Sequence, residues 1–391
     1  MTGEIILLRY GEVGLKGKNR DFFESILVQN VNRAVGRLDA TVKNRSGRIV
    51  VHVPAENAGA ALDALSRVFG IVSVSPAVRT ALEPGEIERA ALEAVLREAH
   101  PPFTFKVEAK RAEKRFPLTS PEINRAVGTF ILDALEREGV EVDVHNPQVT
   151  VHIDVRSDGA YVFCRVISGP GGLPLGASGK GLLLLSGGID SPVAGWYMMK
   201  RGIALEAIHF HSFPYTSEKA RQKAVDLSES LSRWGLPVPL HICQFAPIQE
   251  AIGRSCPDEM ITIVMRRMMF RIAERVARRR ECQALITGES VGQVASQTLE
   301  SMNTIGRVTG MTVLRPLCGL DKLEIIDRAR RIGTFDISTR PFEDCCAMFV
   351  PRNPRTKPRP EQAEEAEARM DVTALVEEAV EGIQTLVSQG G

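Results

Sequence analysis

The sequence predicts an α/β protein of more than one domain, with a doubly wound parallel sheet in its C-terminal half. Three observations lead to this prediction. At 391 residues the chain is longer than one ordinary hydrophobic core supports. Strand-like apolar runs alternate with helical patterns from residue 182 onward, as in repeated βα units. Before them, residues 168–179 break all periodicity with glycine, proline and serine, as a linker or hairpin does.

The first region combines two strand-like runs, residues 4–9 and 48–53, with a helical stretch at 22–38 between them. A loop at 9–20 carries three glycines and four basic residues, a composition suited to phosphate contacts. The candidate RNA contacts in this loop are Lys16, Lys18 and Arg20.

The next region predicts a second α/β unit. Its helical patterns cover residues 56–69, 85–98 and 120–138, and its strand-like runs cover 71–75, 103–109, 148–155 and 160–167. Ser120 followed by Pro121 has the pattern of an N-cap and a first helical position. Residues 101–125 hold six basic side chains against three acidic ones, so this region is a second candidate RNA surface. The candidate contacts are Lys110, Arg111 and Lys114.

The C-terminal half predicts four strands, at residues 182–185, 204–210, 238–242 and 284–287, each followed by a helical pattern. Ligands of parallel sheets bind at the carboxyl ends of the strands. We therefore expect the loop after Leu185, the pair His209-Phe210 and the loop at 288–290 to converge on one crevice.

The turn after the first of these strands is the strongest chemical signal in the chain. Four consecutive leucines end at Leu185, and Ser-Gly-Gly-Ile-Asp-Ser follows at 186–191 before Pro192 opens a helix. Glycines admit an anion close to the backbone, and a helix N-terminus favours pyrophosphate-like charge. The turn is neither a Walker A loop nor a G-x-G-x-x-G motif. The alternative interpretation is a tight turn that needs glycine for steric reasons alone.

The net charge of +1 is the sum of oppositely charged blocks. Residues 266–280 hold seven arginines and one glutamate, whereas the last 31 residues hold eight acids and one arginine. Such blocks suit a protein that binds a polyanion on one surface, although each block could equally be a solvated helix face.

The seven cysteines are an odd number and form no C-x-x-C pair, which indicates reduced thiols in a cytoplasmic protein. We expect no membrane segment, because no apolar run approaches spanning length. A zinc site is not expected, since His209 and His211 have no cysteines at ligand spacing.

Ser186–Ser191 resembles the S-G-G-x-D-S signature of the PP-loop ATP pyrophosphatases, and residues 105–116 with Glu122-Ile123 resemble a THUMP RNA-binding module. Read with the loop at 10–20 and the segment around Cys345-Cys346, the chain resembles the ThiI-type tRNA 4-thiouridine synthases in a short form without a rhodanese domain. The resemblance implies these parts: a ferredoxin-like region 1–58, a THUMP domain 59–167, a linker 168–180 and a PP-loop domain 181–391.

The resemblance implies that ATP activates the O4 atom of a tRNA uridine as an adenylate, and that persulfide sulfur then displaces AMP to give 4-thiouridine. It also implies sulfur supply for the thiazole of thiamine. The implied partners are tRNA, a cysteine desulfurase or other persulfide donor and a thiamine sulfur-carrier protein, and a homodimer is compatible with it.

The implied nucleotide site places Mg²⁺ at Asp190 and a phosphate-stabilising charge at Arg266. His209 could instead be a core-edge histidine with a satisfied hydrogen bond. The nucleotide-site candidates are Leu184, Leu185, Ser186, Gly187, Gly188, Asp190, Ser191, His209, Phe210, Arg266, Gly288 and Gln297.

Sulfur transfer requires a reachable thiolate, and Cys345 and Cys346 are the candidates. Cys345 aligns best with the sulfur-handling cysteine of the family, Cys346 is nearly equal, and two buried structural cysteines are the alternative. Without a rhodanese domain, sulfur would arrive directly from a desulfurase or through a separate carrier.

Two other classes of function share part of this pattern. Another PP-loop enzyme, of the tRNA 2-thiolation, NAD synthetase or lysidine synthase type, would share the Ser186 turn but not the whole set of motifs. A non-catalytic tRNA-binding protein would explain the basic N-terminal half but would leave Asp190 and the paired cysteines without a role.

Overall fold

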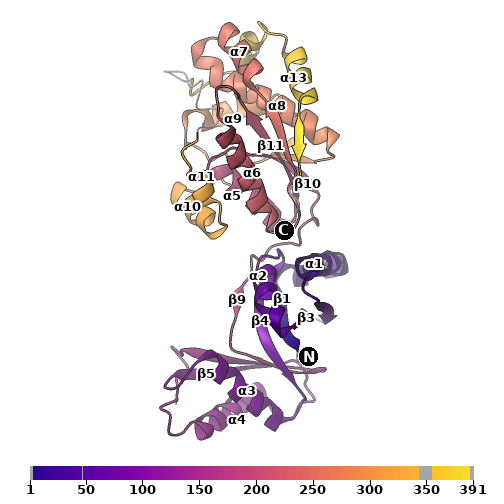
Figure 1. The fold of residues 1–391 in the computed structure, drawn as a ribbon, viewed down its shortest axis with the longest axis vertical. Helices are drawn as coiled ribbons and strands as arrows, with labels where there is room; N and C mark the ends of the chain where they lie inside the picture. Colours follow the sequence, from indigo (N-terminus) through magenta and orange to yellow (C-terminus); the bar gives the residue numbers. More distant parts are fainter. Residues whose placement is uncertain (1–2, 46, 343–354, 388–391) are drawn as a thin grey trace. The chain divides into compact units, whose positions relative to one another are not determined.

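The computed structural model describes residues 3–45, 47–342 and 355–387. The chain divides into two compact units, residues 1–172 and 173–391 (Figure 1). Each unit has its own sheet, and both alternate strands with helices, as predicted.

In the described part of the N-terminal unit, a single nine-stranded sheet has the order β2-β3-β1-β4-β8-β7-β5-β6, with β9 paired to β4. Strand β4 is shared, because it pairs with β1 at Ile71–Ala77 and with β8 at Val78–Thr80. The strands are β1 (Gly3–Tyr10), β2 (Thr41–Arg45), β3 (Arg48–Pro54), β4 (Ile71–Thr80), β5 (Thr104–Arg111), β6 (Glu141–Val142), β7 (Val149–Arg156), β8 (Gly159–Phe163) and β9 (Ile167–Ser168).

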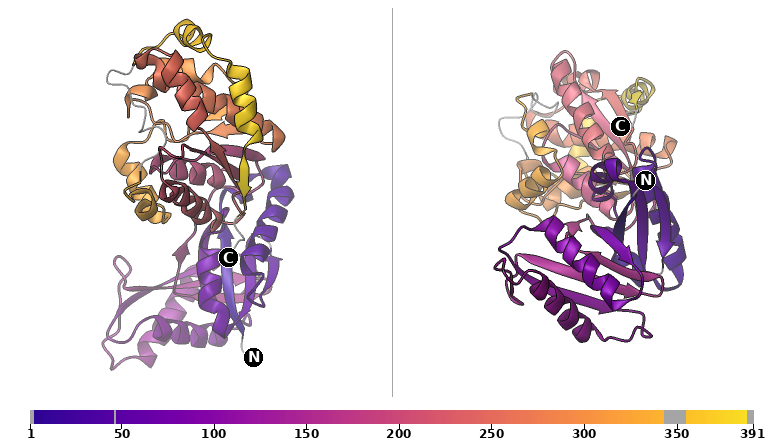
Figure 2. Two further views of the ribbon diagram at one scale, coloured as in Figure 1. Left: turned by 45° about the horizontal axis from the view of Figure 1, so that its top comes forward. Right: turned by 60° about the horizontal axis from the view of Figure 1, so that its bottom comes forward.

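Two pairs of helices cover one face of this sheet. Helices α1 (Arg20–Val35) and α2 (Ala58–Leu65) pack against β1 and β3 around Ile6 and Leu8. Helices α3 (Pro84–Glu98) and α4 (Ser120–Ala134) pack together against β5, β7 and β8 (Figure 2, right). Residues alternate along β1, so Leu7 faces the other side of the sheet, in a cluster made of strand residues alone.

The N-cap of α4 is Thr119 rather than the predicted Ser120. Its backbone N–H and hydroxyl both donate to the Glu122 carboxylate, at 2.7 Å each. The Thr-x-x-Glu spacing of a capping box fixes the helix start one residue earlier, because it satisfies the backbone at both ends of that turn.

In the C-terminal unit the sheet order is β14-β13-β10-β11-β12-β15. The first five strands are parallel, as predicted, and β15 adds an antiparallel edge beside β12. The chain proceeds outward from β10 to β12 and then returns to β13 on the other side of β10, which makes a switch point between β10 and β13. The strands are β10 (Lys180–Leu184), β11 (Ala204–His211), β12 (Leu240–Gln244), β13 (Ala284–Ile286), β14 (Thr312–Leu314) and β15 (Gln384–Leu386).

Helices cover both faces of this sheet, so the leucine strand is buried on both sides. Leu182 packs with residues of α7, α8 and α13, whereas Leu183 contacts α5 so closely that a Cβ on Gly195 would lie 2.7 Å from its Cδ2 atom. The helices are α5 (Asp190–Lys200), α6 (Glu218–Ser232), α7 (Ala246–Ser255), α8 (Ile261–Arg279), α9 (Leu299–Gly306), α10 (Lys322–Arg331), α11 (Phe335–Ser338), α12 (Pro360–Glu367) and α13 (Val372–Glu381). No helix in the described ranges is both long and apolar enough to cross a membrane.

The arginine-rich block on α8 pairs with the acidic C-terminal segment. Glu367 of α12 accepts hydrogen bonds from both Arg267 and Arg271, at 2.7–2.9 Å, and Arg275 pairs with Glu377 of α13 at 3.3 Å. These arginines therefore fasten the C-terminal helices to α8, which neither the polyanion nor the solvated-face interpretation had predicted.

Candidate nucleotide site

The turn between β10 and α5 is stabilised by its own hydroxyl groups. Ser191 Oγ accepts from the Ser186 backbone N–H at 3.0 Å, and Ser186 Oγ accepts from the Gly188 N–H at 3.3 Å. A Cβ on Gly188 would meet only Ser186 Oγ, at 3.4 Å, and its φ is not positive. Neither crowding nor backbone conformation requires glycine at 188, so the steric interpretation does not account for it.

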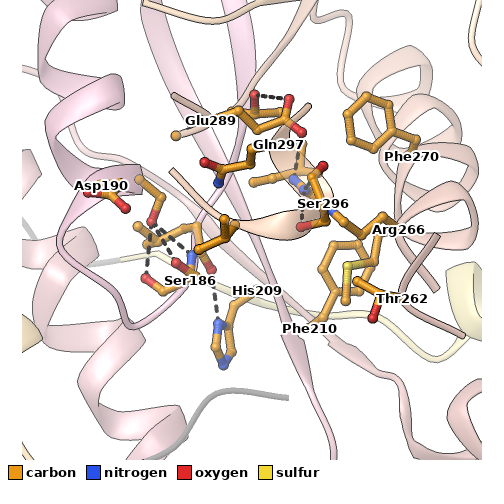
Figure 3. A pocket seen from close by; sticks show the side chains of 17 residues that line it. Ser186, Asp190, His209, Phe210, Thr262, Arg266, Phe270, Glu289, Ser296 and Gln297 are labelled. Carbon is orange, nitrogen blue, oxygen red and sulfur yellow. Dashed lines mark hydrogen bonds and ion pairs between the residues drawn. The ribbon is translucent and has the colours of Figure 1, made fainter. Parts of the chain in front are cut away.

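A cavity of about 290 Å³ opens beside this turn, at the switch point between β10 and β13 (Figure 3). All of the predicted nucleotide-site residues except Gly187 and Gly188 line it, and those two lie in the turn itself. The lining residues are Leu184, Leu185, Ser186, Asp190, Ser191, His209, Phe210, Thr262, Arg266, Met269, Phe270, Thr287, Gly288, Glu289, Val294, Ser296 and Gln297.

The loop after β13 lies directly against the turn. A Cβ on Gly288 would come within 2.7 Å of the Ser191 nitrogen and 2.8 Å of the Asp190 carbonyl carbon. Because these are backbone atoms at the start of α5, they cannot yield to a side chain. Glycine at 288 is what allows the two loops to form one site.

The Asp190 carboxylate is held from two sides. Its Oδ1 atom lies 2.6 Å from Lys322 Nζ, and its Oδ2 atom accepts a hydrogen bond of 2.9 Å from Gln293 Nε2. Within the described ranges no group of three His, Cys, Asp or Glu side chains could hold a metal ion. One carboxylate fits Mg²⁺ only where phosphate oxygens and waters complete the octahedron.

Glu289 is 1% exposed and joins two arginines at the opposite side of the cavity. Arg266 Nη2 and Arg315 Nε each lie 2.7 Å from its carboxylate, and Thr287 Oγ1 donates to it at 2.9 Å. Burial by itself would raise the pKa of Glu289, but the two guanidinium groups outweigh it and the pKa is lowered. The fixed carboxylate orients both arginines and leaves one net positive charge beside the cavity.

His209 has features of both a core-edge histidine and a residue that lines the cavity. It is 3% exposed and its Nδ1 atom lies 2.9 Å from the Leu185 carbonyl oxygen, so it is a bonded core-edge histidine that also lines the cavity. Phe210 packs edge-on against Phe245 at 5.1 Å. Phe210 and Phe270 provide apolar walls suited to an adenine ring.

Several lining residues were not predicted individually. Glu289 follows Gly288 directly, in the loop at 288–290 that the sequence predicted to lie at the crevice. Met269 and Phe270 lie three and four residues after Arg266 on α8, so helical spacing could have identified them. The residues missed were Thr262, Met269, Phe270, Thr287, Glu289, Val294 and Ser296.

The candidate RNA residues lie in the N-terminal unit, and local contacts position three of them. Lys16 pairs with Glu12 at 3.0 Å, and Arg20 contacts Glu24 and the Tyr10 hydroxyl. Arg111 donates to the carbonyl oxygens of Lys114 and Phe116, at 3.4 and 3.1 Å. The exposed side chains are those of Lys18, Lys110 and Lys114.

Cys345 and Cys346 lie outside the described residues. Burial raises the pKa of Cys164 and Cys243 to about 12, and that of Cys256 and Cys282 to about 11. The pKa of Cys318 is raised in the same way. These cysteines carry little thiolate near neutral pH, which makes them unsuited to sulfur transfer.

Three family descriptions match successive parts of the chain. The ThiI ferredoxin-like domain matches residues 5–75, the THUMP domain matches 84–165, and the thiamine biosynthesis protein ThiI matches 176–372. A probable tRNA sulfurtransferase of Brevibacillus brevis is 50% identical over 381 residues, which are 97% of this chain and 95% of that protein. Another, from Moorella thermoacetica, is 50% identical over 382 residues, 97% of each chain.

The structure resembles a crystal structure of a 4-thiouridine synthetase–RNA complex with bound ATP. That protein is 40% identical, the match covers 99% of this chain and 100% of the other, and the TM-score is 0.89. With identity of this extent over nearly the whole length, and with family descriptions covering both units, the chain belongs to the ThiI family of tRNA sulfurtransferases.

Proposed function

We propose that the protein uses ATP to transfer sulfur from a persulfide donor to a tRNA uridine, giving 4-thiouridine. The observation that carries the proposal is the cavity at the β10–β13 switch point, where the Ser186–Ser191 turn faces Arg266 and Glu289. A family relative solved with RNA and ATP supports this use of the cavity.

The first step is activation of the uridine. The O4 oxygen is a poor leaving group, so it attacks the α-phosphorus of ATP, pyrophosphate departs, and the uridine is left as its O4-adenylate. The amides of the Ser186–Ser191 turn and the N-terminus of α5 bind the pyrophosphate. Arg266, oriented by Glu289, stabilises charge on the transferring phosphate, and Lys322, 2.6 Å from Asp190, adds a positive charge beside the turn.

Mg²⁺ would be held by one Asp190 oxygen together with ATP oxygens, and it would neutralise phosphate charge. Asp190 also orients Lys322, whose Nζ atom lies 2.6 Å from its carboxylate. Leu184, Leu185, His209 and Phe210 enclose the adenine, while Gly288 and Gln297 close the nucleotide site from the β13 side.

The second step brings in sulfur. The terminal sulfur of a persulfide on Cys345, or on Cys346 as the near-equal alternative, attacks C4 and the C4–O bond to AMP breaks. A second thiol then attacks the remaining S–S bond, which leaves sulfur on the uridine and a disulfide on the protein. A thiol reductant restores both cysteines.

The N-terminal unit supplies the RNA surface in this proposal. Lys16, Lys18, Arg20, Lys110, Arg111 and Lys114 contact phosphates of the tRNA. The partners are a cysteine desulfurase or other persulfide donor and, for thiamine, a sulfur-carrier protein, and the reaction takes place in the cytoplasm.

Mass spectrometry of tRNA nucleosides from a deletion strain tests the proposal. We expect 4-thiouridine to disappear and to return when the wild-type gene is restored. Retention of 4-thiouridine in the deletion strain would overturn the assignment. Loss of a 2-thiolated nucleoside instead would identify another PP-loop tRNA-modifying enzyme.

A further inference from the structure

Three arginines and one carboxylate gather on the face of the N-terminal sheet opposite helices α1–α4. Arg48 is 3% exposed and Asp154 is 6% exposed. Asp154 accepts hydrogen bonds from Arg48 Nη2 at one oxygen and from Arg156 Nε, at 2.9 Å, at the other. Arg9 lies one step beyond the Leu8–Ile49 pair on β1, which places it opposite Arg48 on β3.

The arginines have donors that the described residues leave unused. Arg9 Nη1 donates to the hydroxyls of Ser73 and Ser75, at 3.0 and 3.1 Å, but Arg9 Nη2 has no partner in the described part of the chain. The same is true of Arg48 Nε and Nη1. Buried guanidinium donors without an acceptor are costly, so these three nitrogen atoms point to an acceptor that the described residues do not supply.

The charge balance leads to the same conclusion. Three guanidinium groups face one carboxylate, which leaves two positive charges. The nearby Glu108 is already within 2.6 Å of Lys106 and 3.5 Å of His152, and Asp158 accepts from the Tyr161 hydroxyl at 2.9 Å. Burial, together with the charges of Arg48 and Arg156, lowers the pKa of Arg9 to about 10 despite the opposing effect of Asp154.

Aromatic rings fix the two arginines in place. The Arg9 guanidinium carbon lies 4.3 Å from the centre of the Phe163 ring, and that of Arg48 lies 5.5 Å from the centre of the Tyr161 ring. Both rings are almost fully buried on β8. Because the guanidinium planes are held before any ligand arrives, little side-chain entropy is lost on binding.

We propose that Arg9, Arg48 and Arg156 form an anion-binding site that takes a phosphate group. A phosphate presents oxygens in several directions, so it can accept hydrogen bonds from more than one guanidinium group. The phosphate belongs either to an RNA chain or to a free anion, and the chemistry of recognition is the same. The site lies wholly within the N-terminal unit and does not depend on the sulfur-transfer reaction.

Hydrogen exchange of the full chain, followed by mass spectrometry, tests the proposal. We expect inorganic phosphate, compared with chloride at equal ionic strength, to slow exchange of the peptides that cover β3 and β8. Acetate is the control anion. Arg9→Gln should weaken the phosphate effect about tenfold. Arg45→Gln makes the same charge change at a side chain that is 52% exposed and should leave the effect unaltered.

A second variant guards against misfolding. Arg48→Lys keeps the charge but removes the Nε and Nη1 donors, and it should lose phosphate protection while retaining wild-type exchange in chloride. Binding of a tRNA transcript then shows whether the phosphate belongs to RNA or to a free anion. If RNA provides it, inorganic phosphate competes with the transcript and Arg9→Gln lowers the salt slope by about 0.7–0.9. If a free anion is the ligand, phosphate protection occurs with tRNA affinity unchanged.

Absence of phosphate protection, together with equal tRNA affinity of wild type and Arg9→Gln, would overturn the site. That result would leave 4-thiouridine formation untouched, so the two proposals fail separately.

Discussion

Lys322 Nζ lies 2.6 Å from Asp190 Oδ1, although 132 residues separate them in the chain. Each is the first residue of its helix, Asp190 of α5 and Lys322 of α10. The pair joins two helix N-termini, where anions are favoured, and Asp190 lines the candidate nucleotide cavity. A phosphate that enters therefore meets a lysine already positioned by the carboxylate beside it.

Asp190→Ala is expected to abolish ATP-dependent pyrophosphate release and to leave tRNA affinity unchanged. Asp190 lies at the cavity in the C-terminal unit, whereas the candidate RNA side chains lie in the N-terminal unit. Pyrophosphate release and filter binding measure the two properties separately. Unchanged pyrophosphate release would refute the role of Asp190.

Lys322→Gln removes the charge without removing Asp190, and we expect pyrophosphate release to fall about a hundredfold. The matched control is Lys219→Gln, a change of equal charge on α6. Steady-state kinetics with ATP at saturation measures the loss. A rate equal to that of the control would show that Lys322 serves only as a counter-ion.

Replacement of Lys110, Arg111 and Lys114 by glutamine should weaken tRNA binding more than catalysis at saturating tRNA. Each lost phosphate contact is expected to lower the slope of log affinity against log salt by about 0.7–0.9. Arg111 also donates hydrogen bonds to the carbonyl oxygens of Lys114 and Phe116, so its loss could disturb the loop itself. A variant that changes only the two lysines therefore measures the loss of RNA contacts with the loop intact. Arg331→Gln in the C-terminal unit is the control, and an unaltered slope would mark the cluster as a solvated face.

Cys345→Ser is expected to eliminate 4-thiouridine formation from a persulfide donor and to spare ATP consumption, because activation precedes sulfur entry. Excess sulfide should restore part of the thiolation if this cysteine only carries sulfur. Cys346→Ser is assayed in parallel, with Cys318→Ser as the control. Full activity of both variants would refute a cysteine relay at these positions.

Glu206 carries the clearest pH dependence of the C-terminal unit. It is 4% exposed and accepts from Lys180, His241 and Arg280 at 3.1, 2.7 and 2.8 Å. Burial would raise the pKa of Glu206, but these three partners lower it to about 2. A lowered pKa means that the stabilisation is complete above the unfolded value of 4.5 and is lost as pH falls from there to about 2.

Glu206→Gln should accordingly lower the free energy of unfolding by about 3 kcal/mol at neutral pH. Denaturant unfolding from pH 7 down to pH 3 measures both effects, with the exposed Glu229→Gln as control. An acid-induced loss as large in Glu206→Gln as in the wild type would assign the pH dependence to other carboxylates.

Local patterns predicted the parts of the fold that depend on neighbours in sequence. The leucine strand and the βα alternation follow from burial on both faces, which leaves a continuous apolar run. Strand β15 could not be predicted, because Gln384–Leu386 is short and partly polar and becomes a strand only by pairing with β12. The antiparallel edge of the sheet therefore depends on tertiary contacts and not on the local sequence.

In the candidate site, too, some residues could be predicted from local sequence and others only from the fold. Ser186–Ser191 and Gly288 belong to continuous motifs, and the structure brings them into contact. Lys322 belongs to no motif, and its partner Asp190 could be identified only from the fold, as could the pairing of Arg315 with Glu289. The arginines of α8 had no identifiable partner in the sequence, since Glu367 follows Arg267 by 100 residues.

The nucleotide cavity is built from the ends of β10, β11 and β13 and from one face of α8. Because these segments are distant in sequence, the site forms only once they have come together. Any nucleotide that binds there binds only the folded unit and therefore stabilises it against unfolding. At a hundredfold excess over its Kd, such a ligand raises the free energy of unfolding by about 2.7 kcal/mol. The resistance of this unit to heat and proteases should therefore follow the ATP concentration around it.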